Sequence, residues 1–283
     1  MTSTTNYWDN IERVKNFMNT ADAVLVGIGA GMSTAAGFTY SGERFHKYFD
    51  DFHKKYGITD MYSGGFYSFE SMEEYWAWWS RHIYYNRYDT PAGVPYVQLM
   101  NLLQDKNYFV ITTNVDHQMQ LAGVDKNRLY YMQGDYGLWQ CSEPCHQKTY
   151  DNEEQVRRMV NEQKDMKIPT ALIPHCPRCG ELMTMNLRID GTFVQDEGWY
   201  AAQNRYADFI ERYKDKKLIM LEIGVGYNTP MIIKYPFMRM AHDNIDALYV
   251  PINIENQPIP FEIHKNTVSF NNDIQKVMND LLS

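Results

Sequence analysis

The sequence predicts an α/β protein in which a doubly wound parallel sheet carries a second, smaller lobe. Three observations predict this class. Short apolar runs alternate with amphipathic segments along most of the 283 residues, a glycine-rich stretch follows the first apolar run, and all four cysteines lie between residues 141 and 179. Alternating strands and helices favour a parallel sheet with helices on both faces.

The elements of the sheet layer are predicted in chain order from their apolar spacing. Residues 7–19 repeat apolar side chains at helical spacing, and the run AVLVGI that follows is typical of a buried parallel strand. Further strands are expected at residues 108–112, 217–223 and 247–254. Helices are expected at residues 69–88, 204–213, 231–241 and 272–282.

Two segments interrupt this alternation and are interpreted as the smaller lobe. Residues 38–90 are rich in aromatic side chains and predict a helical module, while residues 134–190 hold the cysteines and predict a zinc-ribbon module. The sheet domain then comprises residues 1–37, 91–133 and 191–283.

Composition and charge exclude several classes of function. The net charge is −8 and no long basic stretch is present, which argues against nucleic acid as a partner because phosphate binding needs clustered Lys and Arg. Residues 1–20 show no apolar signal-peptide core, and no apolar run reaches the length of a membrane span. The sequence therefore predicts a soluble cytoplasmic protein without a membrane partner.

A glycine loop follows the first predicted strand and is a candidate phosphate-binding turn. It reads Gly27-Ile28-Gly29-Ala30-Gly31, and small residues continue to Gly37. Glycines let a backbone approach a pyrophosphate, and the next helix N-terminus offers it free N–H groups, as in Rossmann-like domains. A tight strand-to-helix turn without a ligand is the alternative. The acidic residue that dehydrogenases place about 20 positions further on is not found on a second strand here.

The four cysteines form two short knuckles that predict a structural zinc site. Cys141 and Cys145 have C-x3-C spacing, and Cys176 and Cys179 have C-x2-C spacing. Two such turns supply four thiolates to one tetrahedral ion and leave no open position for catalysis. Free core cysteines are the alternative, and His146 and His175 are neighbouring alternative ligands. Zn²⁺ is expected to stabilise the small lobe.

Together these motifs resemble the sirtuin family, and the matches run in family order over residues 23–255. The loop Gly29-Ala30-Gly31-Met32-Ser33, with Gly37, resembles the sirtuin G-A-G-x-S…G signature, and Thr112 to Asp116 (TTNVD) resembles T-Q-N-I-D. The cysteine knuckles are similar to the sirtuin zinc ribbon. Later, Gly224-Val225-Gly226 resembles G-T-S, and Asn253-Ile254-Glu255 resembles the N-x-E that holds the adenosine ribose.

The resemblance implies NAD as the bound nucleotide and assigns expected roles. Asn114, Asp116 and Gln133 are the candidate catalytic residues. Candidate NAD-binding residues also include Gly29, Ala30, Gly31, Ser33, Gly37, Arg44, Thr112, Gly224, Val225, Gly226, Asn253 and Glu255. For Asn114 and Asp116 a capping role after the strand is the alternative. Arg44 is either a replacement for the missing motif arginine or a solvated side chain.

Departures from the family pattern point to a divergent member. Gln133 stands where sirtuins carry their catalytic His, Thr39-Tyr40-Ser41-Gly42 stands for Pro-Asp-Phe-Arg, and Met119 replaces a later His. This resembles the class M bacterial sirtuins linked to macrodomain proteins. That resemblance implies mono-ADP-ribosyl transfer from NAD to a protein acceptor, with a lipoyl-carrier protein as acceptor and a macrodomain hydrolase as a further partner.

The chemistry of residue 133 separates the possible reactions. Deacylation needs a base with a pKa near neutrality to activate a ribose hydroxyl, and glutamine only forms hydrogen bonds. Transfer of ADP-ribose does not need that step. We therefore expect a protein ADP-ribosyltransferase that releases nicotinamide. Alternatives are a deacylase, an NAD glycohydrolase and a non-enzymatic NAD sensor. His117, Asp135 and His146 are further candidate bases, each also explained as a surface or capping residue.

Overall fold

The computed structural model describes residues 4–283, and its larger lobe is built on a six-stranded parallel sheet. The strand order is β3-β2-β1-β7-β8-β9. These strands are β1 (Ala23–Ile28), β2 (Tyr108–Thr112), β3 (Leu129–Tyr131), β7 (Leu218–Ile223), β8 (Leu248–Asn253) and β9 (Phe270–Asn271). Every residue of β1, β2 and β7 is buried, as a parallel sheet covered on both faces requires.

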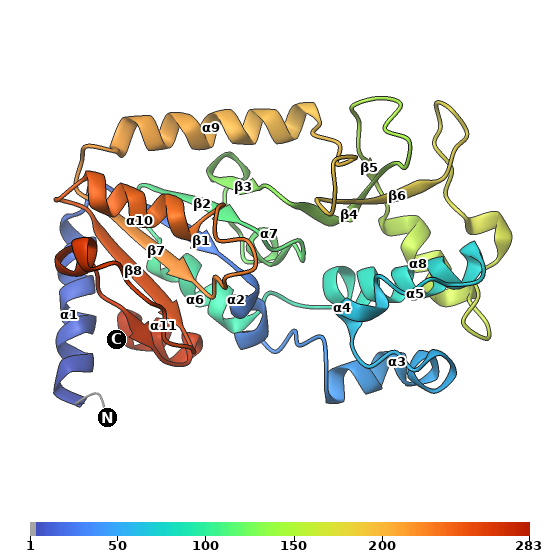
Figure 1. Ribbon diagram of the computed structural model, residues 1–283, viewed down its shortest axis with the longest axis horizontal. Helices are drawn as coiled ribbons and strands as arrows, with labels where there is room; N and C mark the ends of the chain where they lie inside the picture. The colour runs from blue at the N-terminus through green and yellow to red at the C-terminus, as the bar shows by residue number, and fades with distance from the viewer. Residues whose placement is uncertain (1–3) are drawn as a thin grey trace.

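Helices cover both faces of this sheet (Figure 1). One face packs against α1 (Thr4–Thr20), α6 (Val94–Leu102) and α11 (Ile274–Leu282), and the other against α9 (Glu197–Tyr213) and α10 (Lys234–Asp243). Two short helices, α2 (Ala30–Ala35) and α7 (Gln118–Leu121), follow β1 and β2, and 3-10 turns occupy Lys126–Arg128 and Phe261–Asn266. The predicted doubly wound α/β fold is therefore confirmed.

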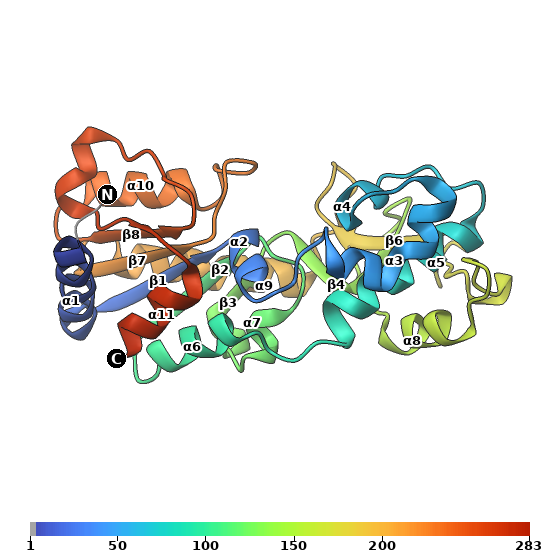
Figure 2. The same ribbon diagram turned by 90° about the horizontal axis from the view of Figure 1, so that it is seen from below.

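The smaller lobe lies beside the sheet along the long axis of the molecule, as Figures 1 and 2 both show. Its helices are α3 (Glu43–Tyr56), α4 (Met61–Gly64), α5 (Met72–Ile83), the π-helix η1 (Tyr84–Tyr88), α8 (Glu153–Glu162) and the 3-10 turn η3 (Thr170–Leu172). Its antiparallel sheet has the order β5-β4-β6, from β4 (Gly134–Cys141), β5 (Tyr150–Asp151) and β6 (Met183–Leu187).

One aromatic core joins the two inserted segments of the smaller lobe. Phe45, Phe49 and Phe52 of α3 pack with Trp76 and Trp78 of α5, and the same cluster includes residues of β4, α8 and β6. Burial of these large rings provides much of the driving force for folding this lobe. On this basis we propose that residues 38–90 and 134–190 form the smaller lobe and that the rest of the chain forms the sheet domain. Residues 1–3 lie outside the part of the chain that the structure describes.

Several predicted elements differ from the observed ones at their ends. The helix expected at 204–213 begins at Glu197, because Asp196 caps it by accepting the Trp199 N–H at 2.8 Å. The helix expected at 69–88 begins at Met72, after the Ser71 cap, and its last turn is the π-helix η1. The helix expected at 231–241 begins at Lys234. Within residues 4–283 no helix has the length and apolar character to cross a bilayer.

Candidate functional site

The carboxyl ends of the central strands meet at one edge of the sheet, facing the smaller lobe. Ile28 at the end of β1 pairs with Thr112 on one side and Ile223 on the other. The chain winds in opposite directions from β1 and β7, which makes this edge a topological switch point. Crevices at such points are the usual ligand sites of open α/β sheets.

Two loops at this edge of the sheet touch through their backbones. The N–H of Gly31 donates to the carbonyl oxygen of Gly224 at 2.9 Å, and Gly29 N–H donates to Ile223 at 3.0 Å. A Cβ at Gly31 would lie 2.7 Å from Gly224 Cα, and Gly224 has a positive φ of 63°. Side chains at either position would push the loops apart. The glycines thus let the two loops pack backbone against backbone at the carboxyl ends of β1 and β7, as the strand-to-helix turns of dinucleotide-binding sheets do.

A cluster of polar side chains lies directly beside the glycine loop. Ser33 of α2 donates its hydroxyl to Asp116 Oδ2 at 2.5 Å. Asn114 Nδ2 lies 3.0 Å from Gly29 O, from Ser33 Oγ and from the hydroxyl of Tyr96. The structure therefore brings together three predicted site residues from β1–α2 and β2–α7. Tyr96, on α6, was not predicted, because one tyrosine in an apolar helix carries no signal of its own.

The electrostatics of this cluster are dominated by burial. Asp116 is only 7% exposed, and burial raises the pKa of its carboxyl, partly offset by the Ser33 hydroxyl and the Gln118 N–H. Burial, with the Asp116 carboxylate nearby, raises the pKa of Tyr96 well above its ordinary value. A buried, energetically costly carboxylate at the carboxyl ends of the strands is typical of a functional site rather than of a surface cap.

The remaining predicted nucleotide residues lie along the same edge. Thr112 ends β2 and accepts the N–H of Asn114 on its hydroxyl at 3.0 Å. Asn253 ends β8 and donates its side-chain amide to Val225 O at 3.2 Å. Glu255 is exposed two residues later. No atom lies within 4 Å of a Cβ built at Gly37 or at Gly226, and Ala30 is exposed at the first turn of α2.

Gln133 is half-buried in the turn between β3 and β4. Its carbonyl oxygen accepts the Arg188 N–H at 3.0 Å, and its side chain makes no hydrogen bond with residues 4–283. The Tyr136 N–H donates to Val115 O at 2.8 Å, so the start of β4 is held against the loop of Asn114 and Asp116. Gln133 is thus positioned near this loop with a free side-chain amide.

Arg44, in contrast, has its own partners inside the smaller lobe. Its guanidinium donates to Asn86 Oδ1 at 2.9 Å, to Tyr85 O at 2.7 Å and to Thr39 O at 3.1 Å. Burial lowers the pKa of this group. All three acceptors lie near the two ends of the helical module, residues 38–90. The structure therefore does not bring Arg44 into the polar cluster.

Two hydrogen-bonded tyrosine hydroxyls link the two inserted segments of the smaller lobe and were not predicted. Tyr40 and Tyr136 share a hydrogen bond of 2.7 Å, and the Tyr136 hydroxyl lies 2.9 Å from His82 Nε2. Burial, with the positive charge of Arg44, lowers the pKa of His82 to about 3, so this imidazole is neutral at physiological pH. Tyr40 occupies the segment that departs from the family motif, which is the one signal that the sequence offered.

The four cysteines come together as a metal centre. Their Sγ atoms all lie within 4.8 Å of one another, with Cys141 and Cys179 3.6 Å apart and Cys145 and Cys176 3.7 Å apart. Tetrahedral zinc with bonds of about 2.3 Å requires sulfur separations of about 3.8 Å. The cluster therefore fits structural Zn²⁺. His146 contacts Cys145 at 3.0 Å and Tyr150 at 2.7 Å, beside the thiol cluster.

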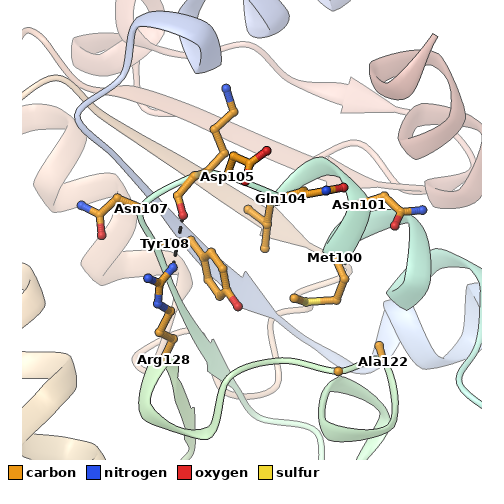
Figure 3. A pocket seen from close by; sticks show the side chains of 11 residues that line it. Met100, Asn101, Gln104, Asp105, Asn107, Tyr108, Ala122 and Arg128 are labelled. Atoms are coloured by element: carbon orange, nitrogen blue, oxygen red, sulfur yellow. Dashed lines mark hydrogen bonds between the residues drawn. The ribbon is translucent and has the colours of Figure 1, made fainter.

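A hollow of about 700 Å³ lies elsewhere, at the opposite ends of the strands (Figure 3). Tyr108, the first residue of β2, lines it together with Arg128 and Lys106. The Arg128 guanidinium donates to Lys106 O at 3.2 Å. Because the glycine loop and the polar cluster follow the other ends of the strands, this hollow is separate from the candidate site.

The fold and site define a dinucleotide-binding α/β protein with a cysteine-built zinc centre. A model of the Sir2 family matches residues 29–210, more than half of the chain, and the chain belongs to this family. It is 41% identical over 272 residues to "Protein ADP-ribosyltransferase" of Staphylococcus aureus (strain Mu50 / ATCC 700699), covering 96% of this chain and 86% of that protein.

A fungal relative and several solved structures extend the comparison. "Probable bifunctional ADP-ribose hydrolase/ADP-ribosyltransferase" of Fusarium oxysporum f. sp. cubense is 31% identical over 244 residues. The matched region is 80% of this chain and 39% of that protein. Sir2Tm bound to a propionylated peptide is 18% identical, covers 96% of this chain and 97% of its own, and has a TM-score of 0.61. A Sir2–p53 peptide–NAD⁺ complex, also 18% identical with the same coverage, has a TM-score of 0.58. These structures share the fold.

Proposed function

We propose that this chain is a sirtuin-type, NAD-dependent protein mono-ADP-ribosyltransferase. The observation that carries the proposal is the 41% identity, over nearly the whole chain, to a protein named as an ADP-ribosyltransferase. Gln133 supports it, because this residue stands where sirtuins carry their catalytic His yet has no basic atom for the deacylation step. In this proposal ADP-ribose passes to a protein acceptor and nicotinamide is released.

The order of the loops along this edge of the sheet supports a specific placement of NAD. We assign the pyrophosphate to the loop Gly29-Ala30-Gly31, which leads into α2, and to Ser33 and Gly37 in and after that helix. We assign the adenosine to Gly224, Val225, Gly226, Asn253 and Glu255 at the ends of β7 and β8. Asn114, Asp116 and Gln133 then face the nicotinamide ribose, with Thr112 supporting Asn114.

The chemistry of the chain in this proposal is mainly positioning and charge stabilisation. NAD supplies the group that is transferred: its nicotinamide–ribose bond breaks, and the bonding electrons leave with nicotinamide. Asp116 places a buried carboxylate where positive charge develops on the ribose, and Asn114 holds Ser33 and the glycine loop in place. Gln133 orients the ribose by hydrogen bonding. The acceptor replaces nicotinamide on the ribose and loses a proton.

We further propose that a lipoyl-carrier protein is the acceptor and that a macrodomain hydrolase is a partner that reverses the reaction, in the cytoplasm. The resemblance to class M sirtuins supports the acceptor. The name of the fungal relative joins a hydrolase to a transferase in one longer protein, which supports the partner. The four thiols suit a reducing compartment.

Intact-protein mass spectrometry tests this function. Lipoylated and unlipoylated carrier proteins are incubated with the enzyme and NAD. We expect one ADP-ribose on the lipoylated carrier and an equal amount of released nicotinamide. Nicotinamide without a modified protein would favour the glycohydrolase. NAD-dependent removal of acyl groups from lysine peptides would favour the deacylase, and NAD binding without any product would favour the sensor.

A further inference from the structure

His117 has an unusual backbone and a fixed partner. It follows Asp116 directly and has a φ of 65°, in the left-handed region that residues with a side chain seldom adopt. Its Nδ1–H donates to Asp135 Oδ2 at 2.5 Å. Such backbone strain tends to occur where function requires a particular side-chain position.

Asp135 is itself held so that only one of its oxygens faces His117. Its Oδ1 accepts from Arg87 Nε at 2.7 Å and from the Gly137 N–H at 2.7 Å. Burial alone would raise the pKa of this carboxyl, but His117 and Arg87 outweigh burial and hold it below its ordinary value. Asp135 is therefore an ionised, nearly inaccessible anchor. Arg87 comes from the π-helix η1, a distortion often found at functional sites.

This arrangement leaves Nε2 of His117 as a free proton acceptor. Donation of Nδ1–H to a carboxylate fixes the tautomer, and the carboxylate stabilises the imidazolium that forms when Nε2 gains a proton. The imidazole is 26% exposed, and Nε2 has no hydrogen bond with any described residue. The charged groups around it are Asp135 on β4, Arg87 on η1 and the neighbouring Asp116.

We propose that His117, oriented by Asp135, is the general base that accepts the proton of the incoming acceptor during transfer. The proposal rests on the proposed function and deepens it. The bond from the acceptor atom to the ribose forms as the nicotinamide–ribose bond breaks. Nicotinamide leaves with the bonding electrons, and the acceptor proton moves to Nε2 and then to solvent. Position supports this role, because His117 adjoins Asp116 and Asp135 lies two residues after Gln133.

Azide tests the proposal without knowledge of the acceptor. Azide is an anion that attacks without losing a proton, so it needs no base. The variants are His117→Asn and Asp135→Asn, with His242→Asn as a matched control, since His242 is exposed and, among the described residues, pairs only with Asp243. Each is incubated with NAD and sodium azide, and nicotinamide, ADP-ribose and ADP-ribosyl azide are measured.

We expect His117→Asn to lower formation of ADP-ribose about 100-fold, and to raise the azide-to-water product ratio similarly. Asp135→Asn should shift the ratio in the same direction, and His242→Asn should leave it unchanged. NAD binding and the thermal midpoint show whether a variant is folded. An unchanged product ratio in folded His117→Asn would show that His117 is not the general base, and the proposed transferase function would still stand. If the wild-type protein released no nicotinamide even when the lipoylated carrier protein was added, the proposed function would fail together with the proposed general base.

Discussion

Lys234 and Glu222 form an ion pair that is fully enclosed in the larger lobe, between α10 and β7. Their side chains are 0% and 2% exposed, and Tyr249 donates its hydroxyl to the second carboxylate oxygen at 2.7 Å. Burial raises the pKa of Glu222, which Lys234 and Tyr249 partly counteract. The pair lies directly below the Gly224 loop, because Glu222 is two residues before it.

Removal of one partner of this pair should destabilise the protein strongly. Lys234→Met leaves a buried, unpaired carboxylate, and a loss of about 3–5 kcal/mol in the free energy of unfolding is expected. The double variant Lys234→Met with Glu222→Gln should recover much of that loss, because no charge remains buried. Urea unfolding of the three proteins measures both values. If Lys234→Met were as stable as wild type, the ion pair could not be enclosed as described.

The contact between Gly31 and Gly224 predicts a loss of NAD binding when either gains a side chain. Gly31→Ala puts a methyl group 2.7 Å from Gly224 Cα, so the loops must separate, and NAD affinity should fall at least about tenfold. Gly191→Ala is the control, since nothing lies within 4 Å of its Cβ. Calorimetric titration with NAD measures the affinity. Equal NAD affinity in both variants would show that the glycine loop is not part of the binding site.

Asp116 should lower stability while it supports activity. Its folded-state pKa is raised by burial, so its stabilising contribution is full below the ordinary aspartate pKa and is lost as pH rises through the folded-state pKa. Asp116→Asn should therefore raise stability at pH 7 by about 0.5–2 kcal/mol and abolish nicotinamide release. Thermal midpoints from pH 4 to 8 test the sign. A variant that is less stable than wild type at pH 7 would refute it.

Loss of zinc should unfold the smaller lobe before the sheet domain. We expect one Zn²⁺ per chain by elemental analysis, and Cys176→Ser should lose it because Cys176 is buried in the shared core. Trp76 and Trp139 lie edge to face in that core with their ring centroids 4.9 Å apart, so tryptophan fluorescence reports its disruption. Chelation that removes zinc without changing this fluorescence would mean that the aromatic core folds independently of the metal.

The sheet was predictable because its strands carry a strong local signal. Runs such as AVLVGI and YFVIT are apolar throughout, and β1 and β2 begin and end where the pattern predicts. The small lobe was predicted only in outline. Half of the residues in helices α3 and α8 are charged, because each helix buries only one face and exposes its other faces to water. Helix starts depended on caps such as Asp196 and Ser71.

The candidate site was predictable where motifs are contiguous and was missed where residues meet only in space. Ser33, Asn114 and Asp116 are brought together as the motif order indicated. Tyr96 and Arg87 come from helices without a motif, and their roles depend on hydrogen bonds across 18 and 48 residues. Arg44 was assigned from the expected motif, but its neighbours Asn86 and Tyr85 hold its donors.

The central position of β1 has a consequence for how the chain folds during synthesis. β1 pairs with β7 across 195 residues, as Ala23 opposite Leu218 shows. Ribosomes add about 5–20 residues per second, so one edge of this apolar strand waits about 10–40 s for its partner. Contacts between such distant segments also slow folding itself. Nascent chains should therefore expose an unpaired, aggregation-prone strand edge for many seconds. The rate of synthesis and the supply of chaperones should then determine the yield of folded protein.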